Sequence, residues 1–424
     1  MAGIKHKFVS GKSDGADPTM LQPSNWDDTH EGGVELALID AKGDLIVGSA
    51  ADTVVRLPVG ADGLVVVSDS GATYGLAWGA VPGLAELAAR VYALETGASP
   101  TRPWPLPVTT GTYTVPGSID HTGATDVTAA LNAFIATVPD GSIIDFAEED
   151  AIYKISAYLT IQQRSNLILE GNGWTTLNNV ANANVGGSQL KSFFFNYWPA
   201  SNGAHHITIR NFIATAASPA PGTFQAGEFA SFAHFMAGEF LEVTGIVGSG
   251  FFGDFVTINE DSHYVWVHDN TIANVGRNNV SVMCGNQILV EDNAFGTAGY
   301  TTFDIEPEAG SVANCTNITF RRNTCGTWTN SFVSADGVAS GKIVSGVVIA
   351  DNTVTGDSLL TVMGIYGSAR LSNLSFTGNI TNTSAAGPVL RFQNVDGVLV
   401  SDNTQALSGG SLTETINCTG VSVS

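Results

Sequence analysis

The sequence predicts an all-β protein whose main part is a parallel β-helix, and three observations lead to this prediction. A strand pattern ending in Asn recurs along the chain, each copy carries alternating apolar residues, and Gly is abundant, with 48 among 424 residues. Apolar residues make up 44% of the chain and charged residues 13%. This composition supports a large core and many tight turns, and it excludes a disordered acidic chain.

The repeat becomes clear when the copies are aligned on their final Asn. They read NLILEGN, YVWVHDN, QILVEDN, NITFRRN, GVVIADN, NLSFTGN and GVLVSDN, ending at Asn172, Asn270, Asn293, Asn323, Asn352, Asn379 and Asn403. HITIRN, which ends at Asn211, fits with one residue missing. From Asn270 onward the copies are 23, 30, 29, 27 and 24 residues apart. Units this short cannot bury an apolar face alone, so stacked coils with a shared core are predicted.

Each copy also predicts its local structure. Apolar residues stand five and three positions before the Asn, as Val265 and Val267 do before Asn270, which indicates a strand with one buried face. Asn tolerates the left-handed backbone of a tight corner, and its amide is able to bond to the equivalent Asn one coil away. We therefore expect a ladder of Asn side chains with a structural role.

Composition divides the chain into six segments. Two heptads with Leu84, Leu87, Val91 and Leu94 at their a and d positions predict a short helical neck that bundles several chains, and a helix packed on its own domain is the alternative. A helix capped by Thr125 or Asp126 is expected to close the start of the β-helix. The segments are an N-terminal segment (1–33), a small β module (34–80), the neck (81–99), a Pro-rich linker (100–110), the β-helix with its cap (111–404) and a C-terminal cap (405–424).

Charge and motifs exclude several classes of function. The net charge of −22 argues against nucleic acid and anionic membranes as partners, because both are bound through clustered Lys and Arg. No apolar stretch approaches the ~18 residues of a membrane span, and no apolar core follows the N-terminus as in a signal peptide. The four scattered Cys are expected to be buried thiols, and no cofactor or metal motif is present.

The segment YTTFDIEPE places three carboxylates at alternate positions, Asp304, Glu306 and Glu308. If Phe303 and Ile305 point into the core, these acids point outward. Their backbone spacing of ~6.5–7 Å along a strand fits the ~6.5–9.5 Å that separates the acid and base of an inverting glycosidase. Asp304 and Glu306 are the predicted acid and base, with Glu308 as a tuning partner. A solvated face, a contact edge between subunits and a Ca²⁺ site are the alternatives.

Other side chains are predicted to share a glycan-binding surface with these acids. Trp266 alternates with inward Val265 and Val267, so we expect an exposed ring that stacks on a sugar. Arg277 is expected near Tyr300, one coil away, where it orients a carboxylate or binds an acidic sugar. The remaining candidates for glycan binding are Glu260, Asp261 and His263.

Three stretches resemble phage tail spike and tail fibre proteins. IKHKFVSGKSDGADPTMLQPSNWDDTH is similar to the opening of many tail-associated proteins, and AKGDLIVGSAADTVVRLPVGADGLVVVSDS resembles a module recurrent in phage fibres. TGATDVTAALNAFIATVPDGSIIDF resembles the start of a pectate-lyase-like β-helix. The resemblance implies a right-handed β-helix, a homotrimer, attachment to the virion tail or baseplate through the N-terminus, and contact with host-surface polysaccharide.

The activity is left open by these patterns. A virion subunit that is assembled in the host cytoplasm, acts at the host cell surface and hydrolyses polysaccharide is one hypothesis. A non-catalytic adhesin and a purely structural virion fibre or decoration protein are the alternatives.

Overall fold

The computed structural model describes most of the chain beyond residue 107 and four short stretches near the N-terminus. The described ranges are 45–50, 53–57, 64–68, 76–80, 103–105, 107–180, 192–196, 204–216, 230–307, 313–338, 342–355, 363–367, 371–381, 390–405 and 413–423. The chain forms two compact units, Met1–Thr101 and Arg102–Ser424. The predicted N-terminal segment 1–33 and the helical neck 81–99 lie outside the described residues.

The first unit contains two antiparallel strand pairs in the region of the predicted small β module. Strand β1 (Leu45–Ala50) pairs antiparallel with β2 (Thr53–Leu57), and β3 (Leu64–Ser68) pairs antiparallel with β4 (Leu76–Ala80).

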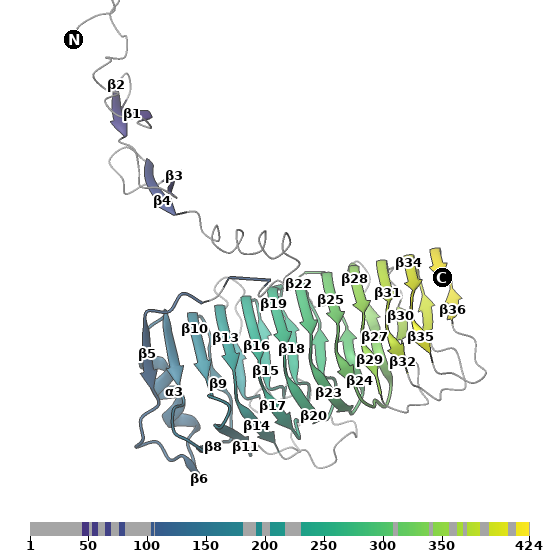
Figure 1. Cartoon of the computed structure of the whole chain (residues 1–424), viewed down its shortest axis with the longest axis horizontal. Helices are drawn as coiled ribbons and strands as arrows, with labels where there is room; N and C mark the ends of the chain where they lie inside the picture. The colour runs from purple at the N-terminus through teal and green to yellow at the C-terminus, as the bar shows by residue number, and fades with distance from the viewer. Residues whose placement is uncertain are drawn as a thin grey trace, which may run out of the picture. The chain divides into compact units, whose positions relative to one another are not determined.

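The second unit is a parallel β-helix, because each turn of the chain adds one strand to each of three parallel sheets (Figure 1). Sheet I has 12 strands, sheet II has 11 and sheet III has 10. At about 4.8 Å per step, the strands of sheet I span roughly 50 Å. The predicted fold class is therefore confirmed, with the right-handed coil expected of parallel strand connections.

Sheet I carries the repeated Asn segments at its strand ends. It consists of β5 (Gly111–Thr114), β7 (Ser142–Asp145), β10 (Ser165–Glu170), β13 (His205–Arg210), β16 (Glu239–Thr244), β19 (Ser262–His268), β22 (Gly285–Glu291), β25 (Cys315–Arg321), β28 (Val344–Ala350), β31 (Leu371–Thr377), β34 (Val395–Ser401) and β37 (Thr419–Val423).

Sheet II follows the Asn corner. It consists of β6 (Thr122–Asp126), β8 (Ile152–Ile155), β11 (Thr176–Asn179), β14 (Ile213–Ala216), β17 (Val247–Ser249), β20 (Thr271–Val275), β23 (Ala294–Ala298), β26 (Thr324–Cys325), β29 (Thr353–Val354), β32 (Ile380–Thr381) and β35 (Thr404–Gln405).

Sheet III completes each coil. It consists of β9 (Leu159–Thr160), β12 (Phe194–Asn196), β15 (Ala233–Met236), β18 (Val256–Asn259), β21 (Val280–Val282), β24 (Thr301–Ile305), β27 (Ser331–Val338), β30 (Met363–Gly367), β33 (Leu390–Gln393) and β36 (Thr413–Ile416).

The core runs continuously through the stacked coils, as the alternation predicts. Val265 and Val267 are fully buried, and they lie in register with Ile288 and Val290 of the next coil. Three of the four Cys are buried thiols, and all four are free. No helix in the described ranges has the length and apolar character needed to cross a membrane.

The cap helix α3 (Thr128–Thr137) lies at the predicted place and buries Leu131 and Ile135. Of the two predicted capping residues, Asp126 accepts a hydrogen bond from the backbone N–H of Thr128 at 2.9 Å. The hydroxyl of Thr125 instead donates to Asp120, at 2.7 Å.

The predicted Asn ladder is present along six coils. The Nδ2 groups of Asn270, Asn293, Asn323, Asn352 and Asn379 each donate to the Oδ1 of the next Asn at 2.9–3.0 Å. The prediction that these Asn residues themselves adopt the left-handed backbone conformation is wrong. The left-handed φ belongs to the residue before each Asn, for example Asp269 at 53° and Asp292 at 58°. The left-handed corner residue directs the following Asn inward. There the Asn amide makes hydrogen bonds to buried polar groups that water does not reach.

The last described residues continue the stack. Strands β36 and β37 pair in register with β33 and β34, so they form part of a further coil in the segment where a cap was predicted.

Candidate functional site

The predicted acidic strand is β24 of sheet III, and its register agrees with the prediction. Phe303 and Ile305 are buried opposite Val280 and Val282, and Ser281 lies beside Asp304. Asp304 therefore points away from the core. It is nevertheless only 2% exposed, so the expectation of a solvated carboxylate is wrong.

Both carboxylate oxygens of Asp304 are occupied by neighbouring coils. Ser334 Oγ donates to Oδ1, and Asn278 Nδ2 donates to Oδ2 at 3.3 Å. Asn278 also donates to Ser281 Oγ at 2.9 Å. Asp304 is thus part of a row of short polar side chains that bond from coil to coil on the outer face of sheet III.

Of the other two acids in the predicted trio, Glu306 and Glu308, only Glu306 is among the described residues. Glu306 follows β24 and is partly exposed, with its backbone N–H donating to Val282 O at 2.9 Å. Glu308 lies outside the described residues. Among the residues described, no group of three or more His, Cys, Asp or Glu side chains is arranged to hold a metal ion.

Three predicted glycan-binding residues lie at the corner between β18 and β19. Glu260 and Asp261 have left-handed φ angles of 50° and 62°, and His263 Nε2 lies 3.1 Å from Asp261 Oδ1. Burial raises the pKa of the Glu260 carboxyl, and the positive charge of Lys342 opposes this rise. Glu260 and Asp261 therefore lie in the turn from sheet III to sheet I, whereas His263 belongs to strand β19.

Arg277 and Tyr300 lie in adjacent coils, as predicted, since the N–H of Tyr300 donates to Arg277 O at 2.9 Å. The guanidinium of Arg277 lies 3.8 Å from Asp254 Oδ1. Arg277 is therefore paired with Asp254, which lies two residues before β18 of sheet III.

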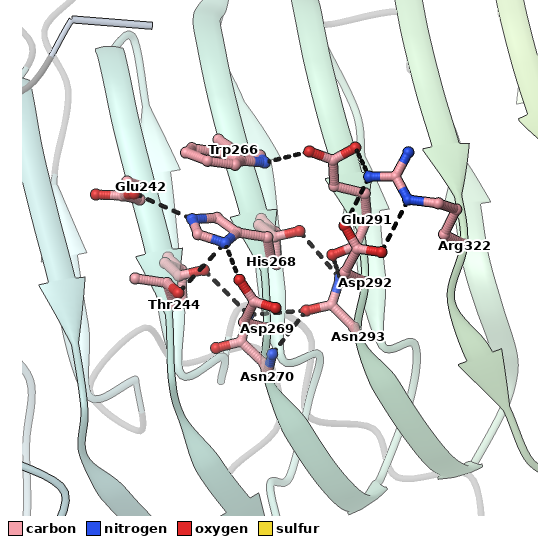
Figure 2. A network of polar contacts seen from close by, with 12 residues as sticks. Glu242, Thr244, Trp266, His268, Asp269, Asn270, Glu291, Asp292, Asn293 and Arg322 are labelled. Atoms are coloured by element: carbon pink, nitrogen blue, oxygen red, sulfur yellow. Dashed lines mark hydrogen bonds and ion pairs between the residues drawn. The ribbon is translucent and has the colours of Figure 1, made fainter. Parts of the chain in front are cut away.

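Trp266 faces outward on sheet I, but the prediction of an exposed platform is wrong. Its side chain is 7% exposed and stacks on His268, with ring centroids 3.5 Å apart and planes at 19°. Its Nε1–H donates to Glu291 Oε1 at 3.0 Å (Figure 2). Neighbours on the outer face of the sheet cover the ring, which alternation along one strand does not reveal.

His268 is held between two carboxylates at the centre of this outer face (Figure 2). Its Nε2 lies 3.0 Å from Glu242 Oε1, and its Nδ1 lies 2.7 Å from Asp269 Oδ2. Glu242 also accepts from the hydroxyl of Thr208 at 2.7 Å. Both ring nitrogens of His268 thus have a carboxylate partner beneath the Trp266 ring.

A second charged group adjoins the first through Trp266. Glu291 Oε2 accepts from Arg321 Nε and from Arg322 Nη2, both at 2.7 Å. Arg322 also forms a two-pronged contact with Asp292, at 2.9 and 2.6 Å. These bonds raise the pKa of Arg322. The buried carboxylates on the outer face of sheet I, Glu242 and Glu291, are thus paired within the protein, as burial requires.

Next to this network, the Pro-rich linker lies over sheet I and borders a small, shallow hollow. The linker is anchored by the backbone N–H of Val108, which donates to Asn166 Oδ1 at 3.1 Å. The hollow is open to solvent. It is lined by Trp104, Pro105, Pro107, Thr208, Phe240, Leu241, Glu242 and Trp266.

Stacked aromatic rings border the hollow. Phe240 stacks on Tyr264 at 4.6 Å with planes at 2°, and on His206 at 4.5 Å. Trp104 packs edge-on against Tyr264 at 5.1 Å. The three stacked residues occupy equivalent positions in adjacent coils, so the parallel register of β13, β16 and β19 places their rings face to face.

Comparison with known proteins supports the fold but assigns the chain to no family. No protein-family model matches the chain, and no curated protein matches it. Among solved structures, the Streptococcus pneumoniae surface adhesin PfbA is similar over 72% of this chain and 100% of its own, with 12% identity and a TM-score of 0.50. The likeness is one of fold.

Two further structures are similar at lower scores. The tailspike protein of E. coli bacteriophage HK620, in complex with a pentasaccharide, matches 71% of this chain and 63% of its own, with 12% identity and a TM-score of 0.43. A GH87 α-1,3-glucanase from Streptomyces thermodiastaticus matches 76% and 70%, with 15% identity and a TM-score of 0.44.

The outer network of sheet I was missed by the sequence prediction, although a signal was available. Residues four and two positions before each repeated Asn face outward, and in consecutive copies these include Trp266, His268 and Glu291. Charged and aromatic side chains at equivalent positions of adjacent coils are expected to meet. No sequence signal predicted that Trp104 lies against sheet I, because a linker has no periodic pattern that indicates which face of a sheet it covers.

Proposed function

We propose that the chain is a subunit of a phage tail spike or tail fibre that binds host-surface polysaccharide through the outer face of sheet I. The observation that carries this proposal is the solvent-open hollow beside the buried network, which is lined by the aromatic residues Trp104, Phe240 and Trp266 together with Glu242. Aromatic rings with a few polar groups are the surface that sugars require, because a sugar ring has apolar faces and a polar edge.

The virion context is supported by sequence. Residues 1–33 resemble the opening of tail-associated proteins, and the heptads of residues 81–99 are of the kind that bundles chains. A homotrimer, attached to the tail or baseplate through its N-terminus, would present three copies of sheet I and raise avidity for a repetitive polymer. The acidic chain would favour neutral polysaccharides over polyanions.

The experiment is retention of the purified full chain on a panel of immobilised bacterial capsule, O-antigen and cell-wall polysaccharides. Binding that saturates, and that free polysaccharide of the same type displaces, is the expected result. If the folded protein is retained by no member of a panel that covers the bacteria from which the phage is propagated, glycan binding is ruled out and a structural role is favoured.

Hydrolysis is the second candidate, and the observation that favours it is the pair Asp304 and Glu306. The two residues lie two positions apart at the end of β24, with Asp304 oriented by Ser334 and Asn278. Release of reducing ends from a bound polysaccharide would be followed for the parent, for Asp304→Asn/Glu306→Gln, and for Asp402→Asn as an exposed control. Loss of release in the double variant alone would assign catalysis to the pair. Binding without release in the parent would make the protein an adhesin.

A further inference from the structure

A row of buried Phe side chains at the start of the sheet III strands is interrupted by two polar residues. Phe232 and Phe255 stack on one another with ring centroids 5.5 Å apart, and Phe332 belongs to the same row further along the β-helix. Between Phe255 and Phe332, the register of sheet III places first Asn279 and then Thr302. We propose that Asn279 and Thr302 bind one internal water molecule, which bridges their side chains inside the core.

The row lies inside the β-helix, although two of its members are polar. Phe255 approaches Phe295 of sheet II, with ring centroids 6.4 Å apart, and Phe332 approaches Phe320 of sheet I at 5.9 Å. A residue at the start of sheet III reaches the inward side chains of the other two sheets only through the core. Both polar residues in the row are 0% exposed, so bulk solvent does not reach either side chain.

The polar side-chain atoms of this pair have no hydrogen-bond partner among the residues that the structure describes. Neither Nδ2 nor Oδ1 of Asn279 is bonded, and neither is Oγ1 of Thr302. A buried amide or hydroxyl without a partner is unfavourable, and nearly all buried polar groups are bonded to protein or to ordered water. Two such residues at equivalent positions of adjacent coils therefore indicate a small ligand that both donates and accepts hydrogen bonds.

Water fits both the chemistry and the space between these side chains. A water molecule is able to donate to Asn279 Oδ1 and to accept from the hydroxyl of Thr302 at the same time. Internal waters typically make about three hydrogen bonds to otherwise unpaired buried groups. The Asn and Thr side chains are several heavy atoms smaller than the Phe side chains on either side of them in the row, and one water needs only about 30 Å³.

The internal water would support the strand that carries Asp304. Asn278, the residue next to Asn279, donates to Asp304 Oδ2 at 3.3 Å on the outer face of sheet III. The Oδ1 of Asn278 also accepts from the backbone N–H of Thr301 at 2.9 Å. A water that joins Asn279 to Thr302 connects the same two coils from the core side. The position of Asp304 is then fixed from both faces of the sheet.

A crystal structure of the full chain, at a resolution that shows ordered waters, tests the site directly. We expect one ordered water within about 2.7–3.2 Å of both the Asn279 amide and Thr302 Oγ1. Electron density without a water between the two side chains overturns the inference. A direct hydrogen bond between Asn279 and Thr302 overturns it as well, because the two groups would then satisfy each other.

Urea unfolding of Thr302→Val gives a second test, because the two possibilities predict opposite signs. The variant keeps the shape of the side chain and removes the hydroxyl. If the hydroxyl is bonded to a water, its loss lowers the urea midpoint; if the hydroxyl has no partner, its replacement by a methyl group raises the midpoint. Thr175→Val is the matched control, because the buried Thr175 hydroxyl donates to Phe146 O at 2.8 Å, and we expect its midpoint to fall.

The outcomes of the stability measurements are distinct. A midpoint that falls in both Thr302→Val and Thr175→Val supports the water, whereas a fall in Thr175→Val alone overturns it. The double variant Asn279→Leu/Thr302→Val should lose less than the sum of the two single losses, because both substitutions remove partners of the same water. Additive losses contradict the bridge. If a variant does not fold, the crystal structure of the parent decides the question.

Discussion

Asn293 occupies the middle of the Asn ladder, and its replacement by Ala is the sharpest test of what holds the coils together. Its Nδ2 donates to Val267 O, Glu291 O and Asn323 Oδ1 at 2.9–3.0 Å. Its Oδ1 accepts from the backbone N–H and the Nδ2 of Asn270, at 3.1 and 2.9 Å. The side chain is 2% exposed, so water does not replace these bonds in the folded protein.

The size of the effect follows from these contacts. Five interactions are lost, and a net value of about 0.5–1.5 kcal/mol for each hydrogen bond gives roughly 2.5–7.5 kcal/mol. Because two amide hydrogens are shared among three acceptors, the lower part of this range applies, about 3–5 kcal/mol. Most of the loss comes from the buried backbone N–H of Asn270 and the carbonyl of Val267, which lose their bonds to Asn293, whereas Asn270 Nδ2 keeps its bond to Val243 O at 3.0 Å.

The assay is urea unfolding followed by far-UV circular dichroism, comparing the free energy of unfolding of Asn293→Ala and the parent. Asn286→Ala is the control, because Asn286 accepts hydrogen bonds from Thr316 and Asn317 in a partly exposed position where water can substitute. We expect this control to lose less than about 1 kcal/mol. Equal losses in the two variants would refute the view that buried ladder bonds stabilise the stack.

Three further predictions concern single side chains. Burial raises the pKa of the Cys315 and Cys325 thiols, so a thiol reagent should label the partly exposed Cys418 in the native protein and the other three only after unfolding; native labelling of Cys325 would contradict its position in the core. Burial also raises the pKa of Glu260 above its ordinary value of 4.5. Between these two pKa values the folded state holds a proton that the unfolded state has released, so the free energy of unfolding should fall as the pH rises from about 4.5 through the folded pKa, and Glu260→Gln should remove this fall in a pH series of urea midpoints. Gln287 has a left-handed φ of 59°, so Gln287→Val should lower the free energy of unfolding by about 1–2 kcal/mol while Gln287→Asn should not; similar midpoints for both variants would mean that the corner relaxes without strain.

The prediction from sequence was accurate where one coil repeats the next. The inward positions of β19, β22 and β24 followed from alternation, and the register of Val280 and Val282 with Phe303 and Ile305 followed from the 23-residue step. The corner was only half understood. The Asn was recognised, but the left-handed residue is its predecessor, such as Asp269, because the Asn itself is needed inside.

The candidate site was predicted less well, since exposure is not a property of one strand. Asp304 and Trp266 both face away from the core as predicted, and both are buried. Ser334 and Asn278 come from coils on either side of Asp304, while Glu291 and His268 enclose Trp266. Ser334, Asn278 and Glu291 are 25–30 residues away from their partners in sequence, and these side chains meet only after the coils stack.

The sequence by itself therefore determined the coil, its period, its core and its Asn ladder, because each of these depends on local alternation and on a repeat that brings like residues together. The tertiary structure alone decided which outward residues remain available to a ligand. That choice depends on contacts between coils and on the linker around Trp104, which crosses sheet I and makes a hollow beside Phe240 and Glu242. A linker has no periodic sequence pattern that predicts its position, so the hollow beside Phe240 and Glu242 is determined by tertiary packing alone.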